Sequence, residues 1–561
     1  MTSYSNIFFM FLEILLISAN NVYAANDLGF VDDSDLTSFV SRPDIKAPIF
    51  NVTVHNANAV TPGYWFLAPY AKINQDMQPV RYYQACQTGP SIYDSAGNLV
   101  WTGACLFKNQ NACDFRASHY NGSDHLSAIL YVFGEDTTGH GVVMNDSYVV
   151  TENIYPPRLV PTFNMHEFNI VEEGRIGLAI IGKAEYVDVT DLGLEQEVGW
   201  VHNQGFREFD VATGDTKFEW WTLGHVHLSA SSVKIDHLDG PHPRGWNWFH
   251  MNSVDKSSDG DYMISSRYTN CIYKISGKDG HVIWRLGGTN SSFVLDGFNF
   301  SRQHDARFIE KNATTEIISF LDNGADDFNT TSSYSSALLV ALDTSVTPMV
   351  ATVIRRWIRP DEQLSRLRGN FQILPNRNAF VAWSANSYIT EHTFDGDLVM
   401  EAQFVSRRFV TYRAYKFNFT GNPNEPPTLK SHVYGTTPKT STTVCHVSWN
   451  GATEVATWEF YRAENSSAQQ PILIGKTSRT GFETMIQFTG FESSIYAEAL
   501  SSDGEVLGRS PIEATIEPST WKVSQTVNGA ADAYSESIDN PIVISKHILS
   551  EKVINVYKEE L

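Results

Sequence analysis

The chain has 561 residues, of which 42% are hydrophobic and 19% are charged. This balance supports a large core and excludes global disorder or a coiled coil, and the length leaves room for one large domain and one or two small ones. The formal net charge of −22 has the wrong sign for broad contact with a phosphate backbone, which argues against nucleic acid as a partner. A local cationic pocket for a small anion remains compatible with that charge.

The N-terminal segment contains an apolar run over residues 7–18 that only Glu13 interrupts. Small and turn-prone residues follow it, which predicts a secretory signal peptide over residues 1–24, cleaved after Ala24, and then an N-terminal extension over residues 25–50. The run is shorter than the ~20 residues of a membrane helix. We therefore expect a protein of the secretory pathway without a membrane span.

Entry into the secretory pathway makes disulfide formation and glycosylation available. Three of the five cysteines lie close together, and one bridge is expected among Cys86, Cys105 and Cys113. Nine Asn-x-Ser/Thr sequons are candidate glycosylation sites: Asn51, Asn121, Asn145, Asn290, Asn299, Asn312, Asn329, Asn418 and Asn465.

Short β-type runs between turn residues recur from about residue 51 to residue 419, without convincing helical periodicity. One pattern, a polar or histidine-bearing start followed by two apolar strands, begins at His166, His250, His304 and Gly369, with separations of 84, 54 and 65 residues. Repeated internal order at irregular spacing predicts the four-stranded blades of a β-propeller, assigned to residues 51–422. The innermost strands of a propeller line one channel, so the four starts are expected to converge there.

A turn cluster over residues 422–427 ends this region. Short strands at roughly ten-residue spacing then predict a small immunoglobulin-like or fibronectin type III-like β-sandwich over residues 428–518. Residues 519–561 form a polar tail. Its last four residues, Lys558 to Leu561, resemble a Lys-Asp-Glu-Leu retrieval signal, and a solvated acidic tail is the alternative. The expected fold class is all-β, and the expected location is outside the cell or in the endoplasmic reticulum lumen.

Four motifs in the repeated region concentrate polar residues. In chain order they are His250-x-Asn252-Ser253, Ser265-Ser266-Arg267, Trp284-Arg285-Leu286-Gly287-Gly288 and Gln303-His304-Asp305. Together they resemble the arylsulfotransferase family over about residues 63–404. The resemblance implies a six-bladed propeller enzyme that moves a sulfuryl group from an aryl sulfate to a phenol, using no nucleotide donor and no other cofactor.

The resemblance also assigns roles to single residues. His304 matches the nucleophile that becomes transiently sulfated, and His250 and His166 match the other two catalytic histidines. Asn252 and Arg267 match substrate-binding residues. Trp248 is our own candidate for an aromatic wall against which an aryl substrate could stack.

The chemistry of these side chains suits sulfuryl transfer. Neutral imidazole, with an ordinary pKa of about 6.5, is a competent nucleophile near neutral pH. A guanidinium can stabilise the negative charge on the oxygens of the transferring group. A second histidine can protonate the leaving phenoxide and then deprotonate the acceptor phenol.

Other interpretations stay open at this point. The histidines could be hydrogen-bonded channel residues, or a three-histidine metal site with Glu167 or Asp305 as a further ligand; we predict no metal. A noncatalytic propeller that binds a glycan or protein, and an aryl sulfatase that uses water as the acceptor, are the alternative functions. The sequence leaves the donor, the acceptor and the oligomeric state open.

Overall fold

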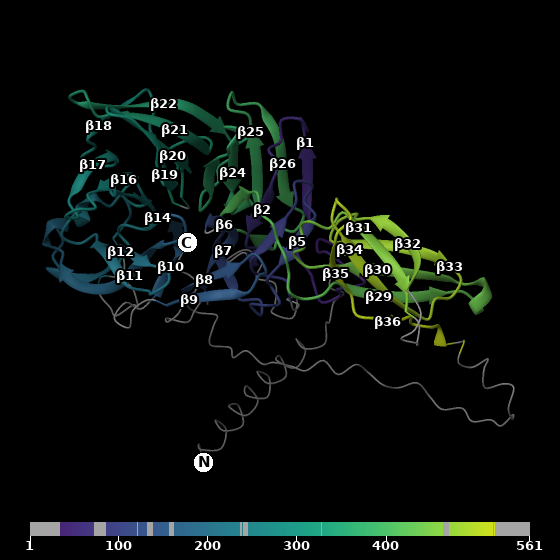
Figure 1. The fold of residues 1–561 in the computed structure, drawn as a ribbon. Coiled ribbons are helices and arrows are strands. Elements are labelled where there is room, and N and C mark those ends of the chain that lie inside the picture. Colours follow the sequence, from purple (N-terminus) through teal and green to yellow (C-terminus); the bar gives the residue numbers. More distant parts are fainter. Residues whose placement is uncertain are drawn as a thin grey trace, which may run out of the picture.

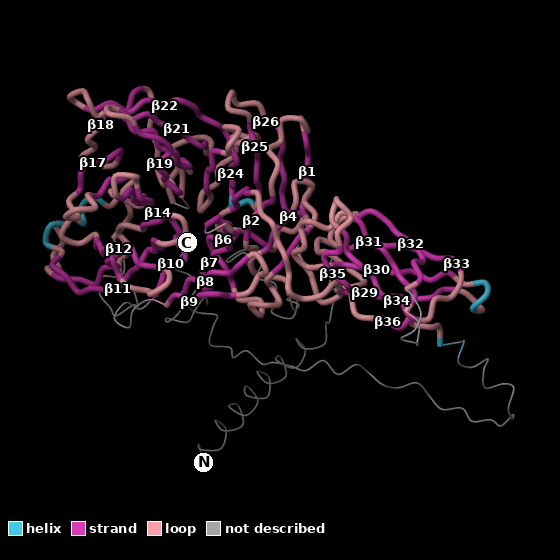
Figure 2. Tube along the Cα trace, viewed as in Figure 1, coloured by secondary structure: helices cyan, strands magenta, loops and turns pink. Residues whose placement is uncertain are grey.

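The computed structural model describes residues 34–71, 86–120, 122–131, 139–155, 162–235, 238, 245–326, 328–463, 471–519 and 521 (Figure 1). The proposed signal peptide, Asn121, Asn465 and nearly all of the polar tail lie outside these residues. The described parts are mainly β-strands (Figure 2), which confirms the all-β class. No helix among them is long and apolar enough to cross a membrane. Short 3₁₀ helices occur at η3 (Thr190–Leu192), η4 (Leu228–Ala230), η5 (Ser384–Asn386) and η6 (Pro438–Thr440).

Six antiparallel sheets, here numbered I to VI in chain order, account for most of the described strands. Sheet I contains β28 (Ala414–Phe417), β2 (Tyr64–Leu67), β4 (Ser91–Tyr93) and β5 (Leu99–Thr102). Sheet II contains β6 (Asn111–Tyr120), β7 (Ser123–Tyr131), β8 (His140–Asn145) and β9 (Val150–Ile154). Sheet III contains β10 (Thr162–Val171), β11 (Ile176–Asp188), β12 (Val198–Asp210) and β13 (Thr216–Trp221).

The remaining three sheets follow the same order of strands. Sheet IV contains β14 (Met251–Lys256), β15 (Tyr262–Ser266), β16 (Cys271–Ile275) and β17 (Val282–Gly287). Sheet V contains β19 (His304–Lys311), β20 (Thr315–Asp322), β21 (Ser336–Asp343) and β22 (Met349–Ile358), with β18 (Phe293–Asp296) parallel to β22. Sheet VI contains β23 (Asn370–Ile373), β24 (Ala379–Trp383), β25 (Tyr388–His392) and β26 (Leu398–Phe404), extended by β1 (Phe50–Val54).

The first strands of the six sheets form a closed ring. Contacts run from β6 to β10, β14, β19, β23 and β28, and from β28 back to β6, and the sheets follow one another around a common centre in Figure 1. Because β28 pairs with β2, a strand that lies near residue 415 completes a sheet begun near residue 65. The small pair of β3 (Tyr70–Ala71) and β27 (Phe409–Val410) joins the same two chain regions. The ring is thus closed by hydrogen bonds between distant parts of the sequence.

Polar side chains of one inner strand hold the backbone of the next. The acceptor on one strand and the backbone N–H on its neighbour are Asp114 and Phe168 (2.8 Å), Glu167 and Val254 (3.2 Å), Asp255 and Phe308 (2.9 Å), Asp305 and Phe371 (3.3 Å), and Asn370 and Ala414 (2.9 Å). A buried acceptor that is already bonded avoids the cost of an unpaired polar group. These bonds fix each sheet at a set position relative to the next.

Four inner strands carry an irregularity at corresponding places. The pairing register shifts between Cys113 and Arg116 in β6, between Phe163 and Phe168 in β10, between Met251 and Ser253 in β14, and between His304 and Arg307 in β19. A β-bulge turns side chains away from the regular alternation of a strand. Each of the last three bulges contains or adjoins a residue that the sequence analysis selected.

Apolar side chains fill the spaces between neighbouring sheets. Both faces of β15 and β16 are buried, as expected for strands covered by a sheet on each side. Between sheets III and IV, for example, the rings of Phe206 and Tyr262 lie 4.8 Å apart. The inner ends of the strands are therefore mounted on a rigid core.

A second unit follows the ring and consists of two sheets packed around their own core. One sheet contains β29 (Thr428–Tyr434), β30 (Thr442–Ser448) and β33 (Glu483–Thr489). The other contains β32 (Ile472–Ser478), β31 (Thr457–Arg462), β34 (Ser494–Leu500) and β35 (Val506–Arg509), with β36 (Glu513–Ala514) on β34. Tyr148 of the ring donates a hydrogen bond to the carbonyl of Gly451 (2.7 Å), and Asn450 pairs with the backbone of Thr102.

The covalent features expected from the sequence can be located on this fold. Cys86 and Cys105 form a disulfide, whereas Cys113 is a free, buried thiol. Asn145 is half-buried and its side chain accepts two backbone N–H bonds. The sequon asparagines with exposed side chains are Asn51, Asn290, Asn299, Asn312, Asn329 and Asn418.

Candidate active site

The three histidines singled out from the sequence come together at one end of the ring. His166 lies in the bulged part of β10, His250 directly precedes β14, and His304 begins β19. The rings of His166 and His250 meet edge to face with centroids 4.8 Å apart. Nδ2 of Asn252 donates to the carbonyl of Gln303 (2.7 Å), which brings the start of β19 at His304 next to the start of β14 beside His250. We call His166, His250 and His304 the histidine cluster.

The hydrogen bonds of His304 fix which ring nitrogen carries its proton. Nδ1 lies 3.0 Å from the backbone carbonyl of Arg302 and 2.7 Å from Oδ1 of Asn323. A carbonyl can only accept, so Nδ1–H is the donor. The Asn323 amide is itself oriented, because its Nδ2 donates to two backbone carbonyls. Nε2 of His304 therefore carries the free lone pair, and it has no hydrogen-bond partner among the described residues.

Burial keeps the histidine cluster uncharged. Desolvation, reinforced by Arg267, lowers the pKa of His304 to about 3. Desolvation also lowers the pKa values of His166 and His250 well below the ordinary value, and the neighbouring histidines and arginines act in the same direction. All three rings are neutral near pH 7, which is the form in which an imidazole nitrogen can attack or accept a proton.

The other two histidines have opposite hydrogen-bonding patterns. Nδ1 of His166 bonds the side-chain oxygen of Asn164, which leaves Nε2 of His166 as an acceptor. Nδ1 of His250 lies 3.0 Å from Nδ2 of Asn247; with that amide nitrogen as donor, Nε2 of His250 carries the proton. The cluster thus offers two acceptor nitrogens and one donor.

Arg267 and Asn252 lie next to the cluster, each with an unused polar atom. The backbone N–H of Arg267 donates to the carbonyl of His250 (3.0 Å), and its guanidinium donates to the carbonyl of Arg366 (3.1 Å). Nδ2 of Asn252 donates to the carbonyl of Gln303 (2.7 Å). Both side chains are buried, and Nε of Arg267 and Oδ1 of Asn252 have no partner within the described ranges.

Aromatic rings line the cluster, but Trp248 is not among those that contact it in the structure. Trp248 is 0% exposed and packs in the core between sheets III and IV, so a ligand could reach it only after its neighbours moved. Tyr268 instead packs on His250 with centroids 4.7 Å apart, and Tyr412 packs on His166 at 5.3 Å. The hydroxyl of Tyr412 is buried and has no partner in the described part of the chain.

Backbone conformation is unusual around the cluster. Four non-glycine residues adopt left-handed backbone angles there, namely His250 (φ 54°), Arg302 (φ 56°), Asp305 (φ 58°) and Arg368 (φ 61°). Such conformations cost about 1–3 kcal/mol each and concentrate at functional sites. His250 directly precedes the bulge of β14, and Asp305 lies within the bulge of β19.

A second group of charges lies directly beneath the histidines along the same strands. We call Asp114, Arg116, Glu167, Asp305, Arg307 and Arg413 the ion cluster. Its ion pairs are Arg116–Asp114 (2.5 Å), Arg116–Glu167 (2.8 Å), Arg307–Glu167 (2.7 Å), Arg307–Asp305 (2.6 Å), Arg413–Asp114 (2.8 Å) and Arg413–Glu167 (3.2 Å), with a longer pair between Arg413 and Asp305 (3.5 Å). Burial alone would raise the pKa of Asp305, but Arg307 and Arg413 hold it below the ordinary value.

A comparison of the sequence with known protein families gives a match over the segment that contains these site residues. A sequence model of the family described as arylsulfotransferase (ASST) matches residues 136–405. Residues 136–405 belong to the arylsulfotransferase family. The matched segment contains the histidine cluster, Asn252 and Arg267, and it does not reach Asp114 or Arg413 of the ion cluster. No curated protein matches the sequence.

The chain is also similar to several solved structures, three of which show low sequence identity to it. A protein of unknown function from Bacteroides caccae is 10% identical, with 64% of this chain and 99% of that chain covered and a TM-score of 0.36. A protein from Lactobacillus plantarum is 10% identical (64% and 100% covered, TM-score 0.31), and the GH43 protein BlXynB from Bacillus licheniformis is 7% identical (71% and 89% covered, TM-score 0.26). TM-scores this low carry no argument about fold or function.

Several residues of the site were missed by the sequence analysis. Asn323 and Tyr412 lie outside the motifs and nothing local distinguishes them, whereas Tyr268 directly follows Arg267 and was passed over. The ion cluster had a signal that went unused, because Asp114-Phe115-Arg116 repeats the spacing of Asp305-Ala306-Arg307. Arg307, two residues after Asp305, forms ion pairs with both Asp305 and Glu167.

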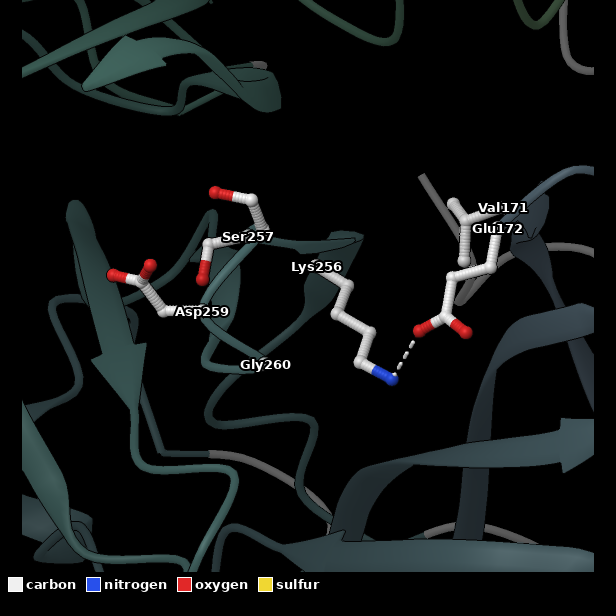
Figure 3. Close-up of a pocket in the computed structure, with 7 residues that line it drawn as sticks. Val171, Glu172, Lys256, Ser257, Asp259 and Gly260 are labelled. Carbon is white, nitrogen blue, oxygen red and sulfur yellow. Dashed lines mark hydrogen bonds and ion pairs between the residues drawn. The ribbon is translucent and has the colours of Figure 1, made fainter.

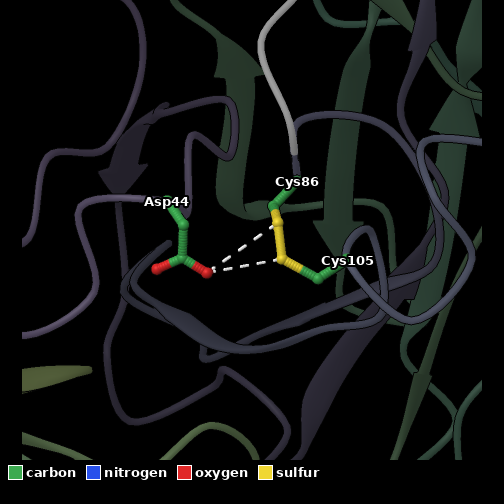
Figure 4. Close-up of side chains that lie close together, drawn as sticks. All are labelled: Asp44, Cys86 and Cys105. Carbon is green, nitrogen blue, oxygen red and sulfur yellow. Dashed lines mark hydrogen bonds between the residues drawn. A yellow bond between two sulfur atoms is a disulfide. The ribbon is translucent and has the colours of Figure 1, made fainter. Parts of the chain in front are cut away.

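The potential metal ligands lie elsewhere. Among the described residues, Asp44, Cys86 and Cys105 are the one group that brings three ligand atoms within 4.8 Å of one another (Figure 4). The two sulfurs are bonded to each other, so neither is a free thiolate. The Asp44 carboxylate also accepts two hydrogen bonds from Arg42 (3.0 and 2.8 Å), which lower its pKa.

A surface pocket of about 370 Å³ lies at the opposite ends of two inner strands (Figure 3). It is lined at the end of β10 by Val171 and Glu172 and beyond β14 by residues 256–260. Lys256 in this pocket bonds both Glu172 (2.7 Å) and Glu208 (2.8 Å), so its charge is already matched. The pocket contains no group of the histidine cluster.

Proposed function

We propose that the protein is an aryl sulfate sulfotransferase that transfers a sulfuryl group to a phenol through a covalent intermediate on His304. The observation that carries this proposal is the arrangement of His304. Its Nδ1–H is held by two acceptors, its Nε2 lone pair is free, and its pKa of about 3 keeps the ring neutral. A neutral, oriented imidazole beside an arginine that has no carboxylate partner suits attack on an anionic sulfur centre.

In the first half-reaction, Nε2 of His304 forms a bond to sulfur while the bond between sulfur and the aryl oxygen breaks. The phenoxide leaves with the electron pair of that bond, and Nε2–H of His250 donates a hydrogen bond to the departing oxygen. The positive charge that develops on the His304 ring is stabilised by Asn323 Oδ1 and the Arg302 carbonyl. Arg267 stabilises the sulfuryl oxygens.

In the second half-reaction, the acceptor phenol loses its proton to Nε2 of His166 as its oxygen attacks sulfur. The bond between sulfur and His304 breaks, and its electron pair returns to Nε2. The low pKa of resting His166 makes it a weak base. An anionic sulfuryl group beside it raises that pKa, because a nearby negative charge favours the protonated imidazole.

The proposal extends to the architecture and the location of the protein. We propose that sheets I to VI are the blades of a six-bladed propeller and that the second unit is a fibronectin type III-like sandwich. The Cys86–Cys105 disulfide and the exposed sequons support a site in the secretory pathway. Deleting Lys558 to Leu561 should then raise the amount of protein in the medium if these residues act in retrieval, and equal amounts would favour a solvated tail.

The deciding experiment incubates the protein with 4-nitrophenyl sulfate, with and without phenol. A transferase releases 4-nitrophenol mainly when phenol is present and forms phenyl sulfate. Release of inorganic sulfate at the same rate without phenol would establish a sulfatase, and no release at all would favour the binding propeller. Rapid mixing with donor followed by an alkaline quench should reveal a protein that has gained one SO₃; transfer without that gain would overturn the covalent step.

A further inference from the structure

The loop over residues 365–369 joins the two sides of the histidine cluster. On one side, Nδ2 of Asn323 donates to the carbonyls of Ser365 (2.6 Å) and Arg368 (3.0 Å), and the same amide accepts from His304. On the other side, the N–H of Gly369 donates to the carbonyl of Tyr412 (3.1 Å), whose ring packs on His166. Arg368 therefore lies in the chain segment between Asn323, which bonds His304, and Tyr412, which packs on His166.

Arg368 differs from the arginines of the ion cluster in having no anionic partner. Within the described ranges its guanidinium forms neither an ion pair nor a hydrogen bond, and its recorded contact is the ring of Tyr70, 5.4 Å from the guanidinium carbon. The side chain is half-buried, and the backbone is left-handed at φ 61°. A partly buried cation that lacks a counter-charge is costly to fold unless something supplies that charge.

Arg368 and Arg267 reach the cluster from different segments of the chain. The guanidinium of Arg267 also donates to the carbonyl of Arg366, in the loop that carries Arg368, and both arginines lower the pKa of His166. Arg267 bonds the backbone of His250 and acts most strongly, after burial, on the pKa of His304. Arg368 acts on the pKa values of His166, Tyr70 and Cys113, which belong to sheets I to III and their connections. Neither arginine has a carboxylate partner in the described residues. The site therefore presents two separate positive charges, although the whole chain has a net charge of −22.

One sulfuryl group can neutralise only one of these charges. We propose that Arg368 binds a second anionic group, a carboxylate or a further sulfate, on the aryl substrate, so that the enzyme prefers dianionic aryl sulfates or anionic phenols. This inference rests on the proposed function for its reaction, but not for its binding site. A guanidinium matches the two oxygens of a carboxylate in a bidentate pair, which a neutral ring substituent cannot form.

The test compares 4-nitrophenyl sulfate with the same ester that carries a carboxylate at ring position 3. The wild-type kcat/KM should be higher for the carboxylated donor by roughly ten- to a hundredfold, the range of one charge-assisted hydrogen-bonded pair. A separate arm keeps 4-nitrophenyl sulfate as donor and compares phenol with 4-hydroxybenzoate as acceptor. The two arms show whether the second anion belongs to the donor, the acceptor or both.

Variants of Arg368 separate recognition from a general electrostatic effect. Arg368→Met should bring the ratio of kcat/KM values close to one, whereas Arg368→Lys should keep most of the preference. Arg368→Asn is a second neutral variant, because asparagine tolerates the left-handed backbone. The matched control is Arg355→Met on the outer strand β22, whose arginine pairs with exposed Asp395 and should leave the ratio at the wild-type value.

A binding measurement separates failure of this inference from failure of the proposed function. Calorimetry should show that 5-hydroxy-2-nitrobenzoate binds the wild type more tightly than 4-nitrophenol does, and that Arg368→Met or Arg368→Asn removes the difference. If 4-nitrophenyl sulfate is turned over but neither kinetics nor binding favours the carboxylated compound, the inference is wrong and the function stands. If no sulfate is turned over but Arg368-dependent binding is found, the function is wrong and the anion site stands. A preference that both neutral variants retain would also overturn the role of Arg368.

Discussion

The histidine cluster and the ion cluster lie on the same inner strands and are adjacent in sequence at His166–Glu167 and at His304–Asp305. They differ in whether the arginines near them have carboxylate partners. In the ion cluster each arginine meets carboxylates at 2.5 to 3.2 Å. Next to the histidine cluster, Arg267 and Arg368 have no carboxylate partner in the described residues, and the three imidazole rings are neutral. A completed network stabilises one structure, whereas unmatched donors beside neutral bases are prepared for a ligand.

The largest expected effect is the loss of activity when the histidine cluster loses its proposed nucleophile, His304. His304→Ala should reduce turnover of 4-nitrophenyl sulfate below detection, because the proposed bond to sulfur forms at Nε2 of His304, whose ring is held by two acceptors. Release of 4-nitrophenol at saturating donor measures the loss. A normal melting temperature would show that the fold is kept.

His250→Ala tests a second residue of the histidine cluster, with a smaller expected loss of activity. A proton-transfer or hydrogen-bonding role is worth about 10² to 10⁴ in rate, so this variant should retain slow turnover that His304→Ala lacks. The control is His227→Ala, at an exposed residue directly before η4, and it should retain the wild-type rate. Equal activity of the wild type and both cluster variants would remove the site from consideration.

Substitutions in the ion cluster should lower the free energy of unfolding. Arg413→Met leaves Asp114 and Glu167 buried without one of their cations, and breaking a buried pair in this way costs about 3–5 kcal/mol. Denaturant unfolding measures the change. The exposed pair of Arg355 and Asp395 provides the contrast, since Arg355→Met should cost at most about 1 kcal/mol. Similar losses in the two variants would mean that the ion cluster does not hold the ring together.

The smallest expected effect is a dependence of stability on pH. The pKa of His304 is about 3 in the folded protein, far below that of an exposed histidine, so the unfolded chain takes up a proton that the folded chain excludes. The free energy of unfolding should therefore fall as the pH drops below about 6.5, by up to about 1.4 kcal/mol per pH unit for each such histidine. His304→Gln should make the loss between pH 7 and pH 5 smaller. Parallel curves for the wild type and His304→Gln would contradict this account of burial.

Much of the architecture could be predicted from local patterns. Alternating apolar runs and turn residues gave the all-β class, and the His-bearing strand starts indicated that His166, His250 and His304 would meet. Local patterns could not show which two of three nearby cysteines pair, or that Trp248 would be fully buried. Those outcomes depend on how neighbouring sheets pack, and the spacing of residues along one strand contains no information about the adjacent sheet.

The sequence by itself determined the chemistry available to this protein: three histidines, an asparagine and an arginine, in motifs that resemble the arylsulfotransferase family and lie within the segment that its model matches. Only the tertiary structure decided how that chemistry is arranged. It assigned the proton of His304 to Nδ1, because Asn323 and the Arg302 carbonyl converge on that atom from different segments. It also paired Arg307 and Arg413 with carboxylates, whereas Arg267 and Arg368 meet no carboxylate among the residues that the structure describes. Protonation and charge balance depend on neighbours brought together by ring closure, and those neighbours are as far apart in sequence as Asp114 and Arg413.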